Sequence, residues 1–158
     1  MANTQSMCTS FMGELMTATH NFGTAPTRGT GATDTFKAAL YLTSATYNAA
    51  TTAYSATGEV SGTNYTAGGV TVTAATPPTA TNSSATAGVA FFTPSASLTY
   101  TTVTLSTAFD TVLIYNSTQS NKAVSVHTFG SQTITAGTFT LTMPTNNTST
   151  ALLRLATT

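Results

Sequence analysis

The sequence predicts an all-β protein, an antiparallel β-sandwich or jelly-roll-like fold with one N-terminal α-helix. Short segments with alternating apolar and polar residues recur along most of the chain, and turn-forming residues separate them at regular intervals. Threonine, a β-branched residue suited to pleated sheets, makes up 41 of the 158 residues. A single domain of this length can bury a substantial core.

The first part of the chain predicts the helix, over residues 5–22. Its apolar stripe at helical spacing consists of Met7, Phe11, Met12, Leu15, Met16 and Phe22. Ser6 is a suitable N-cap, and Asn21 and Gly23 are typical of a helix end. Gly, Pro and Thr dominate residues 23–34 and indicate a linker. We therefore expect an arm over 1–33 and a β-sandwich domain over 34–158.

The rest of the chain predicts eight to ten short strands. Phe36 to Leu42 alternates like a half-buried strand, and Phe139 to Met143 repeats this pattern. The remaining candidates are 59–65, a strand beginning at Val70, 89–92, 98–105, 109–115, 122–129 and 151–156. Pro77-Pro78 is expected to break the sheet and 79–88 to form a surface loop. A polar turn is expected over 116–121, and Gly130 and Gly137 are expected to separate strands.

The charge content indicates where such a protein works. The chain has four acidic and four basic residues and no net charge, which argues against nucleic acid as a partner. No apolar run is long enough for a membrane helix, so no membrane partner is expected. A polar but nearly uncharged surface is typical of proteins outside cells or within large assemblies. The opening MANTQSMCTS lacks the features of a secretory signal. Both properties fit a virion component assembled in the host cytoplasm and released by lysis.

The residue types for catalysis or metal binding are scarce. His20 and His127 are the only histidines, and neither falls in a spacing typical of a metal site. The four carboxylates are not paired by local geometry, as a glycosidase would require. The single Cys8 cannot form an internal disulfide, and its apolar helix position favours an inert buried thiol. We therefore expect no enzyme activity, no cofactor and no metal.

Several segments resemble small virion structural proteins of tailed bacteriophages. The matching segments are MCTSF at 7–11 with Glu14-Leu15 and His20-Asn21-Phe22, DTFKAALY at 34–41, TTAY at 51–54, GEVSG at 58–62, YTAGG at 65–69, IYN at 114–116, NKAV at 121–124, FG at 129–130 and GTF at 137–139. The resemblance spans nearly the whole chain. It implies a structural role in a phage particle and brings no catalytic residues with it.

The resemblance and the composition together favour a head decoration or cement protein that stabilises the capsid lattice. Its partners would be copies of itself and the major capsid protein. A tail-region adaptor, collar or fibre-attachment subunit, with tail proteins as partners, is the alternative. A receptor- or carbohydrate-binding module, with a pocket of tyrosines and carboxylates, is a third possibility. The interface is predicted to consist of Met7, Phe11, Met12, Leu15, Met16, Phe22 and Glu59.

The few charged residues within the matching segments suggest a structural task. Glu14, Asp34, Glu59 and Lys122 are expected to cap backbone groups or to form pairs at subunit contacts.

Overall fold

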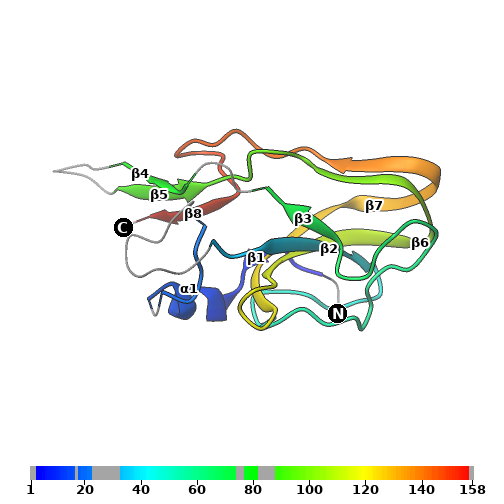
Figure 1. The fold of residues 1–158 in the computed structure, drawn as a ribbon, viewed down its shortest axis with the longest axis horizontal. Helices are drawn as coiled ribbons and strands as arrows, with labels where there is room; N and C mark the ends of the chain where they lie inside the picture. Colours follow the sequence, from blue (N-terminus) through cyan, green and yellow to red (C-terminus); the bar gives the residue numbers. More distant parts are fainter. Residues whose placement is uncertain (1–2, 17, 23–32, 74–76, 82–87, 157–158) are drawn as a thin grey trace.

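The computed structural model describes residues 3–16, 18–22, 33–73, 77–81 and 88–156. The described chain is all-β with a single short helix, as predicted, and its strands form two antiparallel sheets (Figure 1). In chain order the elements are β1 (Ser6–Met7), α1 (Thr9–Met16), β2 (Phe36–Leu42), β3 (Val70–Val72), β4 (Thr79–Ala80), β5 (Val89–Phe92), β6 (Leu98–Asn116), β7 (Lys122–Leu141) and β8 (Leu153–Ala156).

The larger sheet has the strand order β1-β7-β6-β2-β3, and the smaller has the order β4-β5-β8. β6 and β7 form one long antiparallel hairpin, which is closed by the predicted polar turn. Asn116 shapes this turn because its side-chain oxygen accepts hydrogen bonds from the backbone N–H groups of Thr118 and Gln119, at 3.1 Å each. Ser120 and Asn121 adopt the positive φ angles that reverse the chain.

The β6–β7 hairpin folds back on itself and so supplies both layers of the sandwich. Leu98 and Ile114 are sixteen positions apart in β6, which would separate them by roughly 50 Å in a straight strand. Instead they line the same cavity, together with residues of β7. In Figure 1 the orange end of β7 accordingly runs above the yellow-green end of β6. The aromatic ring of Phe139 contacts that of Phe109 across the two layers, with ring centroids 5.1 Å apart.

This fold-back explains why two sequence predictions were wrong. Segments 98–105 and 109–115 were predicted as separate strands, and so were 122–129 and 139–143, but each pair belongs to one continuous strand. Gly130 and Gly137 lie inside β7 rather than between strands. Register irregularities between Leu105 and Thr111 absorb the bend without ending the pairing.

The helix prediction was right about its existence and wrong about its extent. Ser6 is not an N-cap, because Ser6–Met7 pairs with Ser125 and Val126 of β7 as strand β1. The helix then covers eight residues and ends in a turn in which Thr19 N–H bonds to the carbonyl of Glu14 at 2.9 Å. Ala18 takes a positive φ there, which stops the helical path before residues 20–22.

The remaining strands largely follow the predictions. β3, β5 and β8 lie within the segments predicted as strands, whereas 59–65 makes only isolated bridges, through Glu59 and Thr63. Thr79–Ala80 was predicted as loop and forms the short strand β4, while 82–87 lies outside the described residues. β2 is buried on both faces rather than half-buried, because the connection after β2 covers its second face, where the ring centroids of Tyr41 and Tyr47 lie 3.8 Å apart.

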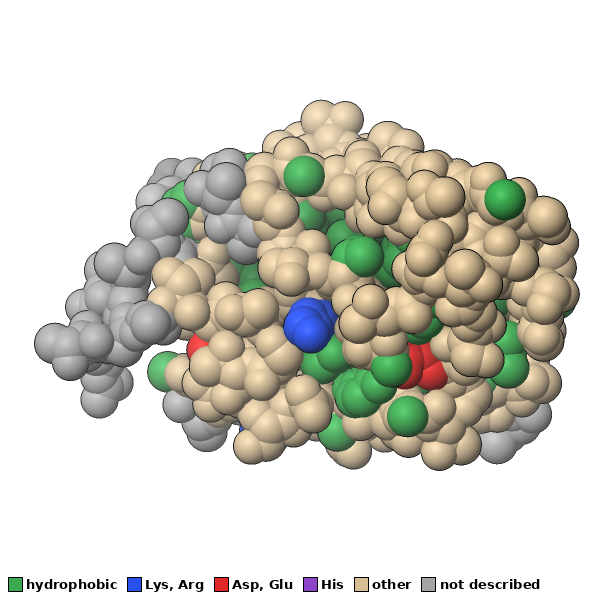
Figure 2. Space-filling model, turned by 45° about the vertical axis from the view of Figure 1, so that its right-hand side comes forward, with side chains coloured by type: hydrophobic (Ala, Val, Ile, Leu, Met, Phe, Trp, Pro, Cys, Tyr) green, Lys and Arg blue, Asp and Glu red, His purple; other side chains and the backbone are tan. Residues whose placement is uncertain are grey.

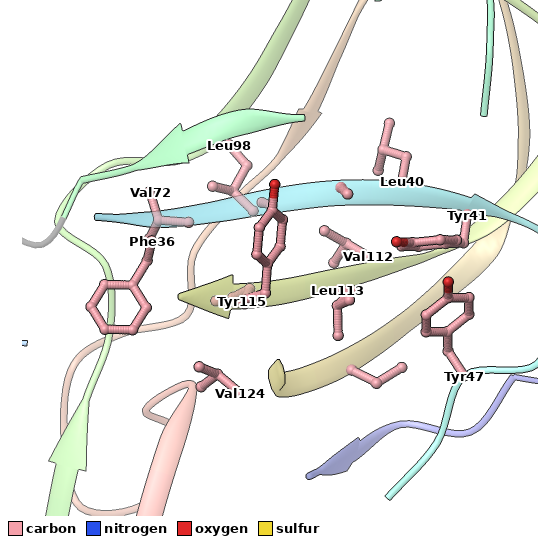
Figure 3. Close-up of a cluster of buried hydrophobic side chains, with 14 of the residues drawn as sticks. Phe36, Leu40, Tyr41, Tyr47, Val72, Leu98, Val112, Leu113, Tyr115 and Val124 are labelled. Atoms are coloured by element: carbon pink, nitrogen blue, oxygen red, sulfur yellow. The ribbon is translucent and has the colours of Figure 1, made fainter. Parts of the chain in front are cut away.

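Buried side chains lie on both faces of the larger sheet, and Figure 3 shows the central part of this core. Leu40 of β2 lies opposite Val112 of β6 and Ala39 lies opposite Leu113, and all four side chains are buried. The hydroxyl of Tyr100 in the upper layer donates to the carbonyl of Ala38 in β2 at 2.8 Å. The sandwich is therefore joined by hydrogen bonds as well as by apolar contact.

Candidate functional site

The predicted interface residues of the N-terminal segment lie on the chain's own sheets. Phe11 and Phe22 are buried in the core, and their rings meet edge to face with centroids 6.0 Å apart. Met7 and Leu15 are partly buried against the same core. Met12 differs, because 47% of its surface is exposed. The side chain of Met16 lies outside the described part, and the role of all these residues in an interface stays a prediction.

A buried polar network fixes this segment to the end of β6, and His20 is at its centre. The His20 side chain is fully buried, with Nε2 2.7 Å from Glu14 Oε2 and Nδ1 3.1 Å from Asn116 Nδ2. The Asn116 oxygen already accepts two backbone N–H groups, so its amide nitrogen must face His20. Nδ1 is therefore the acceptor, and the network assigns the proton to Nε2, which donates to Glu14.

Asp34 extends this network to the start of β2. One of its oxygens accepts from Asn116 Nδ2 at 2.7 Å and from the backbone N–H of Asn21 at 2.8 Å. The other accepts from Gln119 Nε2 at 3.1 Å. Asp34 thus caps a backbone group, as the sequence analysis expected, and holds residues 20–22 against the β6–β7 turn.

Glu14 connects the helix to β7 through Lys122. Lys122 Nζ donates to Glu14 Oε1 at 2.6 Å, so that His20 and Lys122 each occupy one carboxylate oxygen. Burial opposes ionisation of Glu14, but the hydrogen bonds from Lys122 and His20, together with the charge of Lys122, outweigh it and lower the pKa of this carboxyl. Glu14 and Lys122 therefore form a charge pair within one chain, whereas the prediction placed such pairs at subunit contacts.

Glu59 is the centre of a second polar cluster, over the opposite part of β2. Its Oε2 accepts from the Tyr54 hydroxyl, and its Oε1 accepts from the Tyr65 hydroxyl and from the backbone N–H of Gly68, all at 2.7 Å. The Tyr65 hydroxyl in turn accepts from the backbone N–H of Leu40 at 3.0 Å. Glu59 therefore holds the long connection between β2 and β3 against β2.

The hydroxyl groups of the tyrosines in this cluster point into the protein. The rings of Tyr54 and Tyr115 stack with centroids 4.7 Å apart, and the Tyr115 hydroxyl donates to the carbonyl of Gly68 at 2.9 Å. Burial, followed by the hydrogen bond to Glu59, raises the pKa of Tyr54 above its ordinary value. Burial also raises the pKa of Tyr65, and the hydrogen bond to Glu59 adds to this effect. These tyrosines therefore act as neutral donors to the carboxylate.

Gly69 lets the connection approach β2 closely. It has a positive φ of 73°, and a Cβ atom at this position would lie 1.7 Å from the carbonyl oxygen of Ala38. Only glycine fits this position. The carboxylate of Glu59 thus stabilises the contact between this connection and β2, and the absence of a side chain at Gly69 permits it.

A small apolar cavity of about 80 Å³ lies between the N-terminal segment and the smaller sheet. Phe11, Leu15 and Phe22 line one side, and Phe92 and Leu153 line the other. Leu155, which is 41% exposed, lies at the same cavity. With Met7, which also lines the cavity, four of the predicted interface residues come together here, which their helical spacing alone did not indicate.

The other residues considered from the sequence do not gather into one site. His127 bonds to Ser125 Oγ at 2.9 Å, and burial lowers its pKa to about 4. Cys8 is buried, and burial, with a smaller effect of the Glu14 charge, raises the pKa of its thiol to about 12. Among the described residues no group of three His, Cys, Asp or Glu side chains is close enough to bind a metal ion. The described helix is also too short to cross a membrane.

Comparisons with known proteins found no match: no family model, no curated protein and no solved structure is significantly similar to this chain.

Proposed function

We propose that the chain is a non-enzymatic structural subunit of a bacteriophage particle, and most specifically a head decoration or cement protein. The observation that carries this proposal is that all four acidic residues bond to other groups of their own chain. Glu14, Asp34 and Glu59 do so in the two networks described above, and Asp110 accepts from Asn3 Nδ2 at 2.9 Å. The carboxylates therefore serve the structure of the protein, and this favours a structural role.

The surface supports the same proposal. Figure 2 shows a face that is mostly polar and uncharged, with isolated basic and acidic side chains among small apolar groups. Two such surfaces repel each other little, so many copies can pack densely on a lattice. Copies placed across the junctions of a capsid would bury area there, at about 25 cal/mol per Å² before the costs of association. The two networks would keep each copy rigid under the pressure of packaged DNA.

Protein stoichiometry on purified virions tests this proposal. The number of copies is measured relative to the major capsid protein, by quantitative mass spectrometry with labelled standards. A ratio of one to one, or a simple fraction of it, supports a position on the head lattice. A few copies to a few dozen per particle would replace the head proposal by the tail-region alternative. Absence from the particle would overturn both.

A glycan array tests the carbohydrate-binding possibility. The tyrosines and the carboxylate that it requires are present at Glu59, but both oxygens of Glu59 accept hydrogen bonds from the chain itself. This geometry favours a structural use of the cluster. Binding that is lost in a Glu59→Gln variant that remains folded would contradict this interpretation.

A further inference from the structure

The outer edge of β7 beyond Val126 is a long strand edge without a backbone partner in the described part of the chain. Up to Val126, β1 and residues 52–53 cover this edge. From His127 to Leu141 the described residues pair only with its other side, through β6. In Figure 1 this orange stretch runs along the upper right margin of the molecule.

The chain covers other strand edges with its own backbone. Along β2, Val60 N–H bonds to the carbonyl of Leu40 at 3.0 Å, and Leu42 N–H bonds to that of Gly58 at 2.9 Å. Along β6, Thr104 N–H bonds to the carbonyl of Thr63 at 3.1 Å. The edge of β7 beyond Val126 has no such backbone cover among the described residues.

The open edge also lacks common protections against pairing with another strand. Proteins protect exposed edges with charged side chains, prolines and bulges. Residues 128–141 contain no charged residue and no proline. β7 carries extra residues relative to β6 between Thr128 and Gln132 and between Ile134 and Gly137, which blunt the middle of the edge. The stretch from Gly137 to Leu141 has no such insertion.

We propose that the stretch Gly137–Leu141 binds a second copy of this chain by antiparallel strand pairing. A two-fold axis at Phe139 would place Thr138 of each copy opposite Thr140 of the other. Thr–Thr pairs across strands are favourable, and the edge carries no charge that would repel its copy. An isologous contact of this kind needs only one self-complementary edge, and this edge matches itself in composition. The result is a continuous sheet through two copies.

The oligomeric state of the isolated full-length chain tests this proposal. We would measure mass by sedimentation equilibrium over a series of concentrations, and amide hydrogen exchange of residues 137–141 at the two ends of the series. The expected result is a monomer–dimer equilibrium in which these amides exchange more slowly at high concentration. A chain that remains monomeric throughout would overturn the proposal.

Charged substitutions identify the surface used. In Thr138→Lys/Thr140→Lys, like charges would face each other in the dimer, and we expect dimerisation to weaken by at least about tenfold. The matched control is Thr99→Lys/Thr101→Lys on the neighbouring strand β6, where Thr99 is the cross-strand partner of Thr140. All four positions are at least partly exposed, and circular dichroism checks the fold. Equal dimerisation of the two double variants would contradict the assignment of the interface to Gly137–Leu141. If Thr138→Lys/Thr140→Lys does not fold, the single variant Thr140→Lys takes its place.

This inference does not rest on the proposed function. A monomeric chain would overturn the edge pairing and leave the stoichiometry on virions unaffected. Conversely, a dimer formed through β7 would stand even if the chain were absent from a capsid.

Discussion

Removing the carboxylate of Glu59 is expected to destabilise the protein more than any single tyrosine hydroxyl of its cluster. In Glu59→Ala, the buried N–H of Gly68 and the hydroxyl of Tyr65 lose their acceptor. Each buried polar group left without a partner costs about 1–3 kcal/mol, and hydrogen bonds to a charged group lie at the upper end. Together these losses predict a decrease of about 3–5 kcal/mol in the free energy of unfolding. Against a typical stability of about 5–15 kcal/mol, this is a large fraction.

Conservative variants should show a graded series. Glu59→Gln keeps an oxygen for Gly68 and Tyr65 and can donate to the Tyr54 oxygen, so we expect a cost of only about 1–2 kcal/mol. Tyr65→Phe removes the hydroxyl that joins the N–H of Leu40 to the carboxylate, and should cost more than Tyr54→Phe, which removes a single donor. The order expected is therefore Glu59→Ala, then Tyr65→Phe, then Tyr54→Phe.

Urea unfolding at neutral pH measures this series. The chain contains six tyrosines and no tryptophan, so tyrosine fluorescence, with circular dichroism as the second probe, reports unfolding. Coincident transitions by both probes justify a two-state analysis. If Glu59→Ala lies within about 0.5 kcal/mol of the unchanged protein, or if Tyr54→Phe is the worst variant, our account of this cluster is wrong.

Three further predictions concern the rest of the structure. The pKa of Glu14 is lowered on folding, so the stabilisation by this carboxylate is present above its ordinary pKa of 4.5 and is lost as the pH falls below that value. Glu14→Gln should therefore flatten the pH dependence of the melting temperature. At neutral pH this variant should cost about 1–2 kcal/mol, since the partner Lys122 is partly exposed. Folding lowers the pKa of His127 from 6.5 to about 4, so between these pH values the unfolded chain binds more protons than the folded one. The free energy of unfolding should therefore fall by up to about 3 kcal/mol as the pH decreases through this range. Urea titrations at several pH values measure this loss, and His127→Gln should abolish it. Gly69→Ala should cost more than about 3 kcal/mol, whereas Gly130→Ala, with open space around its Cβ position, should stay within about 0.5 kcal/mol, and equal melting temperatures would contradict this contrast.

Local patterns were sufficient wherever neighbours along the chain decide the structure. Alternation correctly predicted β2, and the polar residues after Asn116 correctly predicted the turn between β6 and β7. The prediction that Glu59 caps backbone groups also held, because its partners Tyr54, Tyr65 and Gly68 lie five, six and nine positions away. A scarce charge among nearby tyrosines and glycines was a signal that the sequence itself contained.

The site around His20 could not be predicted in this way. Its partner Asn116 lies 96 positions away, and Lys122 lies 108 positions from Glu14. No local sequence pattern connects Asn116 with His20 or Lys122 with Glu14. The same is true of the helix start, because Ser6–Met7 leaves the helical pattern only to pair with a strand more than a hundred residues later.

The sequence by itself thus determined the class of fold, the position of the main turn and the near absence of charge. Only the tertiary structure decided that β6 and β7 each pass through both layers, that the helix ends after eight residues, and that the edge of β7 beyond Val126 has no backbone partner among the described residues. The physical reason is that periodicity records which face of a segment is buried, whereas the partner of a strand edge or of a buried side chain depends on which distant segment the folded chain brings beside it.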